Sequence, residues 1–209
     1  MIVHRLWFFL CSMTLGFAAI QMRAAQRTLV FFGDSLTAGH GLDDPANESF
    51  PALIQKKITA EGLDWRVVNA GLSGETSAAG LRRVDWILRQ PADVFVLALG
   101  ANDGLRGIAP TVTEANLQGI IDRVRAKYPE TKIVVAGMMM PESMGAEYTQ
   151  AFRAMYPALA KKNSATVVPF LLEGVGGIAA MNHADRIHPN PRGHAVIAET
   201  MWKYLRPLL

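Results

Sequence analysis

The sequence has 209 residues but a single cysteine, Cys11, which lies in an apolar stretch near the N-terminus. The remainder of the chain has no thiol, which excludes a cysteine nucleophile, a metal site with cysteine ligands and a disulfide framework there. With 50% hydrophobic residues, a chain of this length can fill one core without disulfides. It is too short for two comfortable cores, so we expect one domain.

The N-terminus also lacks a hydrophobic run long enough to span a membrane. Residues 6–20 form an apolar run of about 15 residues, whereas a span needs roughly 20. His4 and Arg5 precede the run, and small residues follow it at Ala24 and Ala25, as in secretory signals. We predict a signal peptide over residues 1–25, a mature domain over 26–209 with no stable membrane span after cleavage, and a periplasmic or secreted location. Arg23, at a position that usually holds a small residue, leaves an uncleaved anchor as the alternative.

The chain carries little excess charge. Its formal net charge is +3, and residues 1–25 contribute two arginines and no acidic residue, so the predicted mature domain carries +1. Binding to a phosphate backbone needs a concentrated positive surface. The sequence therefore argues against a nucleic-acid partner.

Two glycine motifs are missing as well. No Gly-x-Gly-x-x-Gly follows the first predicted strand, which argues against a dinucleotide-binding fold. No Gly-x-Ser-x-Gly is present, which argues against the nucleophile elbow of the α/β-hydrolases. The first predicted strand ends instead in Gly33-Asp34-Ser35-Leu36.

The sequence does contain a regular alternation of two patterns. Short apolar runs rich in β-formers alternate with segments whose apolar residues recur every three or four positions. The predicted strands are 28–32, 65–68, 94–99, 132–136 and 165–168, and the predicted helices are 51–60, 78–89, 114–127, 148–162 and 191–205. Asn190 and Pro191 mark the start of the last helix, as its cap and first residue. The alternation predicts an α/β fold, a three-layer α/β/α sandwich around a mainly parallel five-stranded sheet.

The loops after the predicted strands are polar and rich in glycine. In a parallel sheet such loops open on one edge, where open α/β sheets bind their ligands. Three of them directly follow strands, and a fourth follows the last strand and a long loop: 33–35, 69–74, 100–103 and 185–189. We therefore treat the four segments as parts of one candidate site.

Ser35 is the candidate nucleophile at this edge. A serine hydroxyl needs a base within hydrogen-bond reach and a third group that orients the base. Asp185 and His188, three residues apart in a turn, can supply the orienting carboxylate and the base. Pro189 favours this geometry because it keeps His188 out of a helical conformation. Each feature also has a simpler explanation, since Gly-Asp-Ser is ordinary turn chemistry and Asp185 can cap a turn.

Acyl transfer also needs hydrogen-bond donors for a tetrahedral oxyanion. The backbone N–H of Gly74, the side-chain amide of Asn102 and the backbone N–H of Ser35 can serve. The alternatives are a tight turn at Gly74 and a loop cap at Asn102, and either explanation suffices for each residue taken alone.

A metal site is a further alternative. His183, His188 and His194 lie close in sequence to Asp185, and all four side chains can bind metals. Their spacing matches no named zinc pattern, and a serine mechanism needs only one histidine. We therefore predict neither a metal nor a cofactor.

Four blocks, taken together, resemble a known family. They match the SGNH hydrolases of the GDSL family, and most closely the periplasmic group of thioesterase I, arylesterase and lysophospholipase, in order over nearly the whole predicted mature chain. The blocks are Gly33-Asp34-Ser35-Leu36, Asn69-Ala-Gly-Leu-Ser-Gly74, Gly100-Ala-Asn102-Asp103 and Asp185-Arg-Ile-His188-Pro189. The resemblance implies a flavodoxin-like sandwich. Ala101 and Gly71 depart from the residues that this group often has there.

The resemblance also implies roles. Ser35 corresponds to the nucleophile, His188 to the general base and acid, and Asp185 to its orienting partner. Ser35, Gly74 and Asn102 correspond to the oxyanion donors. The implied reaction is hydrolysis of a small-molecule acyl thioester or carboxylic ester through an acyl-enzyme. We expect the enzyme to be a monomer.

An acyl chain needs an apolar groove beside the nucleophile. Leu105 and Ile108 follow the third predicted strand, Met140 and Pro141 follow the fourth, and we expect these four side chains to line the groove. The alternative is that the methionines only finish a buried strand. Two other functions stay open, a carbohydrate acetylesterase on the same scaffold and a non-catalytic binding module. Apolar residues near the site argue against the first, and the complete set of candidate groups argues against the second.

Overall fold

The computed structural model describes residues 26–209. The predicted signal peptide, residues 1–25, lies outside the described residues, so cleavage there stays a prediction. Within the described part, no helix combines the length and the apolar character needed to cross a bilayer.

Five parallel strands form one sheet in the order β2-β1-β3-β4-β5. Their bounds are β1 Arg27–Gly33, β2 Trp65–Gly71, β3 Val94–Ala98, β4 Lys132–Ala136 and β5 Thr166–Val168. The predicted five-stranded sheet is confirmed, and every pairing in it is parallel. The first strand lies between β2 and β3, so the order of strands reverses beside β1 and opens a crevice at their carboxyl ends.

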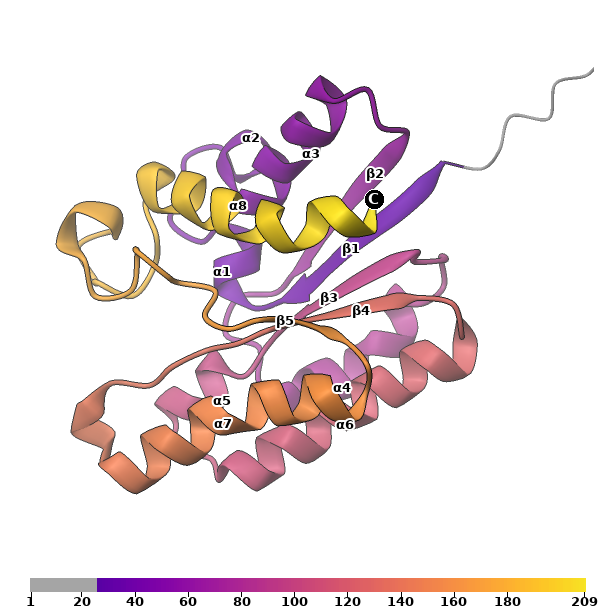
Figure 1. Ribbon diagram of the computed structural model, residues 1–209. Helices are drawn as coiled ribbons and strands as arrows, with labels where there is room; N and C mark the ends of the chain where they lie inside the picture. The colour runs from indigo at the N-terminus through magenta and orange to yellow at the C-terminus, as the bar shows by residue number, and fades with distance from the viewer. Residues whose placement is uncertain (1–25) are drawn as a thin grey trace, which may run out of the picture.

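Helices cover both faces of the sheet and confirm the three-layer sandwich (Figure 1). One face carries α2 Pro45–Glu48, α3 Phe50–Ala60 and α8 Pro191–Leu205. The other carries α4 Ser77–Ile87, α5 Ala101–Leu105, α6 Pro110–Lys127 and α7 Ala146–Lys162. The short helix α1 Ser35–Ala38 follows β1 at its carboxyl end. All five predicted helices are present, and Asn190 caps α8 by accepting from the N–H groups of Arg192 and Gly193.

Some boundaries of helices and strands differ from the predicted ones. Helix α6 begins at Pro110, four positions before the predicted start, because proline is favourable in a first turn and that turn lacks apolar periodicity. The segment 69–71, predicted as loop, continues β2 because it pairs with the end of β1. Helix α5 replaces the loop predicted at 100–103, so Asn102 lies in a helical turn.

The end of β1 is shaped by a close approach. Gly33 has Gly71 of β2 and Ala98 of β3 as its register partners. A Cβ atom at Gly33 would lie 2.1 Å from Thr37 Oγ1 and 2.8 Å from the carbonyl oxygen of Ala98. Only glycine fits where the chain passes from β1 into α1. This tight passage brings Ser35 to the edge at which the three strands end.

The core fills both sides of the sheet, and the α8 side contains a buried histidine. The His194 ring is fully buried and stacks on Phe50, and its Nδ1 accepts a hydrogen bond of 3.2 Å from the Phe50 backbone N–H. Burial, reinforced by the nearby His183 and His188, lowers the pKa of His194 to about 4. The folded protein therefore keeps this ring neutral.

We predict that His194 makes the protein less stable in acid. Its pKa is lower in the folded state than the ordinary value near 6.5, so the unfolded state binds the extra proton. The stabilisation is complete above pH 6.5 and is lost as the pH falls from about 6.5 to about 4. In His194→Asn the Asn oxygen can still accept from Phe50 N–H but does not titrate. The loss of unfolding free energy between pH 7 and pH 4 should shrink by up to about 3 kcal/mol.

Urea denaturation across this pH range measures the effect. His40→Asn, the same change at an exposed position whose ring packs against that of His188, shows how much of the difference comes from losing any histidine rather than the buried one. Equal acid sensitivity of His194→Asn and wild type would show that the buried ring does not contribute.

Candidate active site

Ser35 lies at the first position of α1, directly beyond the carboxyl end of β1. Asp34 caps this short helix, since its carboxylate accepts a hydrogen bond of 3.0 Å from the N–H of Leu36. A residue at the first position of a helix has no intrahelical acceptor for its own N–H. The backbone N–H of Ser35 can therefore serve a ligand at the same edge as its hydroxyl.

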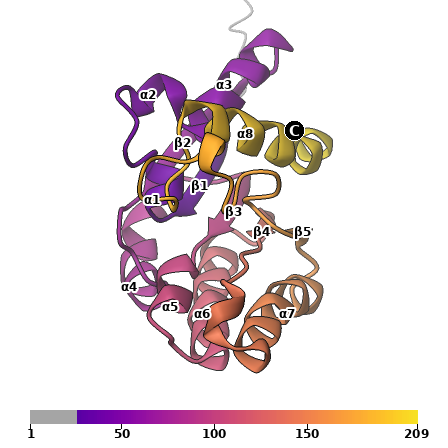
Figure 2. The same ribbon diagram turned by 90° about the vertical axis from the view of Figure 1, so that its left-hand side faces the viewer.

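Three side chains form a continuous hydrogen-bonded chain. His188 Nε2 lies 2.9 Å from Ser35 Oγ, across 153 positions of sequence. On the other side of the ring, His188 Nδ1 lies 2.7 Å from a carboxylate oxygen of Asp185. The structure thus brings together the three residues predicted as nucleophile, base and orienting acid. The loop that carries His188 lies over the same end of the sheet as α1 (Figure 2).

The Asp185 carboxylate is held by its own loop. It accepts hydrogen bonds from the backbone N–H groups of His188, at 3.0 Å, and Ile187, at 2.9 Å. These bonds and the His188 ring hold the pKa of Asp185 well below its usual range. An ionised Asp185 keeps the proton of His188 on Nδ1, which leaves Nε2 as the acceptor for the Ser35 hydroxyl.

The loop that presents His188 is closed by backbone contacts. Asn182 and Pro189 form an antiparallel bridge, and the N–H of His183 donates to the carbonyl oxygen of His188 at 2.8 Å. Pro189 also excludes a helical conformation at the residue before it, as the sequence predicts. The ring therefore projects from a constrained turn.

Of the predicted oxyanion donors, Asn102 lies beside the Asp34-Ser35 turn, and Gly74 lies on the loop between β2 and α4. Asn102 Nδ2 lies 3.1 Å from the carbonyl oxygen of Glu75, to which it donates, and 3.4 Å from an oxygen of Asp34. An amide nitrogen has two N–H groups, so one can stay on Glu75 while the other turns to a substrate oxygen. Gly74 has φ +78, and the guanidinium of Arg106 donates to its carbonyl oxygen at 3.2 Å.

Asp34 is a buried acid for which the sequence motif predicts only a turn. It is 1% exposed, and burial raises its pKa to about 7 against the opposing effects of Leu36 N–H and His188. Its proton is therefore exchanged near neutral pH, beside the Ser35 turn. The position between glycine and the candidate serine is the signal that could have marked it.

A cavity of about 560 Å³ opens beside Ser35 and His188. Its walls are largely apolar, and they include Leu105, Met140 and Pro141 but not Ile108. Ile108 lies just past α5, where its carbonyl oxygen accepts from the hydroxyl of Tyr148 at 2.8 Å. The structure thus brings three of the four predicted wall residues to the cavity.

Other residues of the cavity wall were not predicted from the sequence. They come from the segment after β5 and from the His188 loop: Phe170, Leu172, Gly176, Gly177, Arg186 and Ile187. Because 170–172 closely follows the carboxyl end of β5, the rule that placed the other loops at this edge could have included it.

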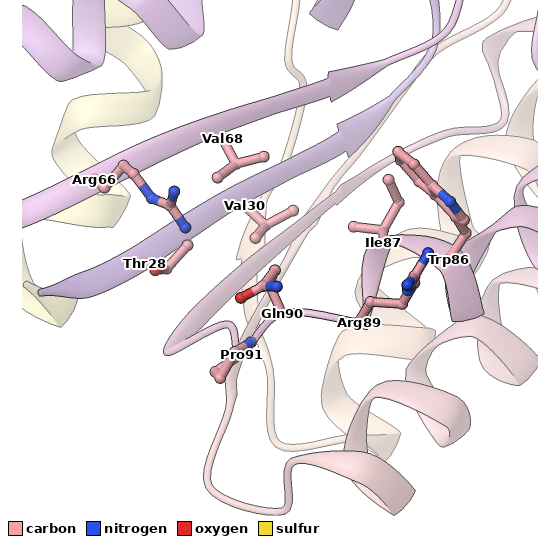
Figure 3. Close-up of a pocket in the computed structure, with 9 residues that line it drawn as sticks. All are labelled: Thr28, Val30, Arg66, Val68, Trp86, Ile87, Arg89, Gln90 and Pro91. Carbon is pink, nitrogen blue, oxygen red and sulfur yellow. The ribbon is translucent and has the colours of Figure 1, made fainter. Parts of the chain in front are cut away.

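A second cavity lies between β1, β2 and the end of α4, where Val30, Val68 and Ile87 point toward one another (Figure 3). Its volume is about 320 Å³, and neither a serine nor a histidine lines it. It cannot support the chemistry of the first cavity.

The histidines do not converge on a common point. His188 lies between Ser35 and Asp185, while His194 Nδ1 accepts from Phe50. Over residues 26–209, no group of three or more His, Cys, Asp or Glu side chains is arranged to hold a metal ion.

Comparison with known proteins gives consistent results. Residues 31–196 match the GDSL-like Lipase/Acylhydrolase family. The chain is 42% identical over 202 residues to Esterase TesA of Pseudomonas aeruginosa, with 96% of this chain and 98% of that protein covered. It is 39% identical over 187 residues to thioesterase 1/protease 1/lysophospholipase L1 of Escherichia coli K12, with 89% and 86% covered.

A crystal structure of TesA has a TM-score of 0.83 and 41% sequence identity, and covers 88% of this chain and 100% of that one. The four predicted blocks fall within the matched region. Residues of the first, third and fourth blocks line the cavity beside Ser35, whereas none of residues 69–74 does. On this combined agreement of sequence and fold, the chain belongs to the GDSL-like lipase/acylhydrolase family.

Proposed function

We propose that this protein is a serine hydrolase that cleaves acyl thioesters and carboxylic esters, including aryl esters and lysophospholipids. The observation that carries the proposal is the 2.9 Å contact between Ser35 Oγ and His188 Nε2, backed by Asp185 at 2.7 Å from Nδ1. The names of the relatives, esterase and thioesterase 1/protease 1/lysophospholipase L1, support the same substrate classes.

The first half of the reaction acylates Ser35. Its Oγ bonds to the acyl carbon while its proton passes to His188 Nε2, and the carbonyl electron pair moves onto oxygen. The Asp185 carboxylate stabilises the resulting imidazolium. When the tetrahedral intermediate collapses, the bond to sulfur or oxygen breaks and His188 gives its proton to the leaving group.

The second half releases the acid. A water molecule loses a proton to His188 and attacks the acyl carbon, and collapse returns that proton to Ser35 Oγ and frees the carboxylic acid. In both halves the N–H groups of Ser35, Gly74 and Asn102 stabilise the oxyanion. Because these donors lie on α1, on the loop after β2 and on α5, the sheet edge has to hold them in place.

The apolar cavity favours an acyl chain as the bound group. Met138, Met139 and Met140 line it together with Phe170, and flexible thioether side chains adapt to variable chain shapes. A carbohydrate site would need planar aromatic and polar groups at this edge. The carbohydrate acetylesterase therefore remains the less favoured function.

We also propose a periplasmic or secreted location, supported by the apolar run at residues 6–20. Recovery of a protein that begins at Gln26 from a periplasmic or culture fraction tests it.

Ser35→Ala should abolish nearly all turnover, because no other group at the site can form the acyl-enzyme. We expect kcat to fall by a factor on the order of 10⁴ or more and labelling by a fluorophosphonate probe to disappear. Ser143→Ala, at an exposed serine, is the matched control and should keep both. Retained labelling of Ser35→Ala would remove this serine from the mechanism.

Asn102→Ala should lower kcat by about 10² to 10³ with little change in KM, since the oxyanion exists only after attack. Steady-state kinetics with a p-nitrophenyl ester measures this. Asn47→Ala, at an exposed asparagine, serves as control. An Asn102→Ala enzyme as fast as wild type would exclude the amide as an oxyanion donor.

The acyl-length profile separates the two candidate substrates. Across p-nitrophenyl esters from acetyl to palmitoyl, kcat/KM should rise above the acetyl value, because longer chains bury more apolar surface in the cavity. Activity confined to the acetyl ester would contradict the acyl-chain proposal and favour the acetylesterase.

A further inference from the structure

Arg186 adopts a backbone conformation that does not suit its type. Its φ is +60, in the left-handed region where a Cβ atom is crowded and glycine is favoured. Among residues 26–209, Ser164 is the only other non-glycine residue with positive φ. Such a conformation persists only where something requires it.

Backbone hydrogen bonds hold the turn, since the Arg186 N–H donates to the carbonyl oxygen of His183 and Asp185 accepts from the next two N–H groups. Glycine could make the same backbone contacts, so they do not explain an arginine at this position. The structure gives its guanidinium no hydrogen bond and no ion pair within the described part of the chain, and the side chain is exposed. Its acidic neighbour Asp185 faces His188 instead, from which it accepts hydrogen bonds. The backbone strain is therefore not offset by contacts of the side chain.

The position of Arg186 gives the guanidinium a place in the active site. Arg186 lines the same 560 Å³ cavity as Ser35 and His188, and it is the only lysine or arginine among the lining residues. It lies two residues before His188, which hands its proton to the leaving group. A leaving group that takes its proton from His188 therefore departs beside the turn that also carries Arg186.

We propose that Arg186 binds a phosphate on the leaving-group portion of the substrate and so favours phosphate-bearing acyl substrates over neutral ones. The inference rests on the proposed function. A guanidinium presents forked N–H donors that match two phosphate oxygens. The apolar walls take the acyl chain, and the single cation takes the charged portion beyond the scissile bond. Both a coenzyme A thioester and a lysophospholipid carry such a phosphate.

The first experiment compares two thioesters with the same acyl group, octanoyl-coenzyme A and the neutral octanoyl-N-acetylcysteamine. We expect the ratio of their kcat/KM values to fall about 10-fold in Arg186→Gln, mainly through KM for the coenzyme A ester. Arg186→Lys should keep part of the ratio because it keeps the charge. Arg192→Gln, an exposed arginine outside the cavity, should keep all of it.

A second comparison distinguishes the sources of phosphate. It uses lysophosphatidic acid against a monoacylglycerol with the same acyl chain, under the same variants. A loss of preference with both substrate pairs supports a general phosphate site, and a loss with one pair identifies its source. An unchanged preference with both pairs overturns the proposal.

A binding measurement separates this inference from the proposed function, because it needs no turnover. In the Ser35→Ala background, calorimetry should show coenzyme A binding about 10-fold more weakly once Arg186→Gln is added. Equal binding overturns the role of Arg186, even if Ser35 proves to be the nucleophile. If the wild-type protein hydrolyses no ester but Arg186→Gln still weakens coenzyme A binding, the phosphate site is supported and the proposed function fails.

Arg186→Gly tests whether the other Arg186 variants act by distorting the loop. Glycine adopts φ +60 without steric cost, so the melting temperature should not drop while the preference for coenzyme A esters is lost. A parallel loss on charged and neutral thioesters in Arg186→Gly and Arg186→Gln would assign the residue to loop geometry and contradict phosphate binding.

Discussion

The parallel register around β1 is the constraint on which the site depends. Gly33 lies level with Gly71 on β2 and with Ala98 on β3, so these strands deliver their following segments to one edge. The close approach at Gly33 turns the chain at once into α1, with Ser35 in its first turn. The candidate oxyanion donors therefore share an edge because the backbone ladder holds three strands in step, not because they attract one another.

Charge at this edge is arranged around His188. Asp185 is kept ionised by two backbone N–H groups and orients the ring, whereas the buried Asp34 has a pKa near 7 on the other side of Ser35. Environment thus separates two carboxyl groups of the same type within one site. Arg186 adds a cation that forms no ion pair with an acidic side chain of residues 26–209. Its guanidinium is therefore available to the substrate.

The chemical groups of the site could be predicted because their demands are local. Ser35 follows a strand, Asp185 and His188 share a turn, and Pro189 restricts the backbone between that turn and α8. The wall of the cavity was less predictable. Ile108 is near Leu105 in sequence, yet only Leu105 lines the cavity. Phe170, which follows the edge strand β5, also lines it. Cavity walls depend on packing between distant segments, which periodicity does not encode.

The layered α/β architecture and the candidate acid, base and nucleophile followed from the sequence alone, since apolar periodicity and motif chemistry are properties of short segments. Only the tertiary structure decided where these segments meet. It extended β2 into a predicted loop, formed α5 around Asn102, and held Arg186 at φ +60 in the cavity wall. The extension of β2 depends on pairing with β1, and the cavity wall depends on packing between segments far apart in the chain, so the local pattern could not reveal either.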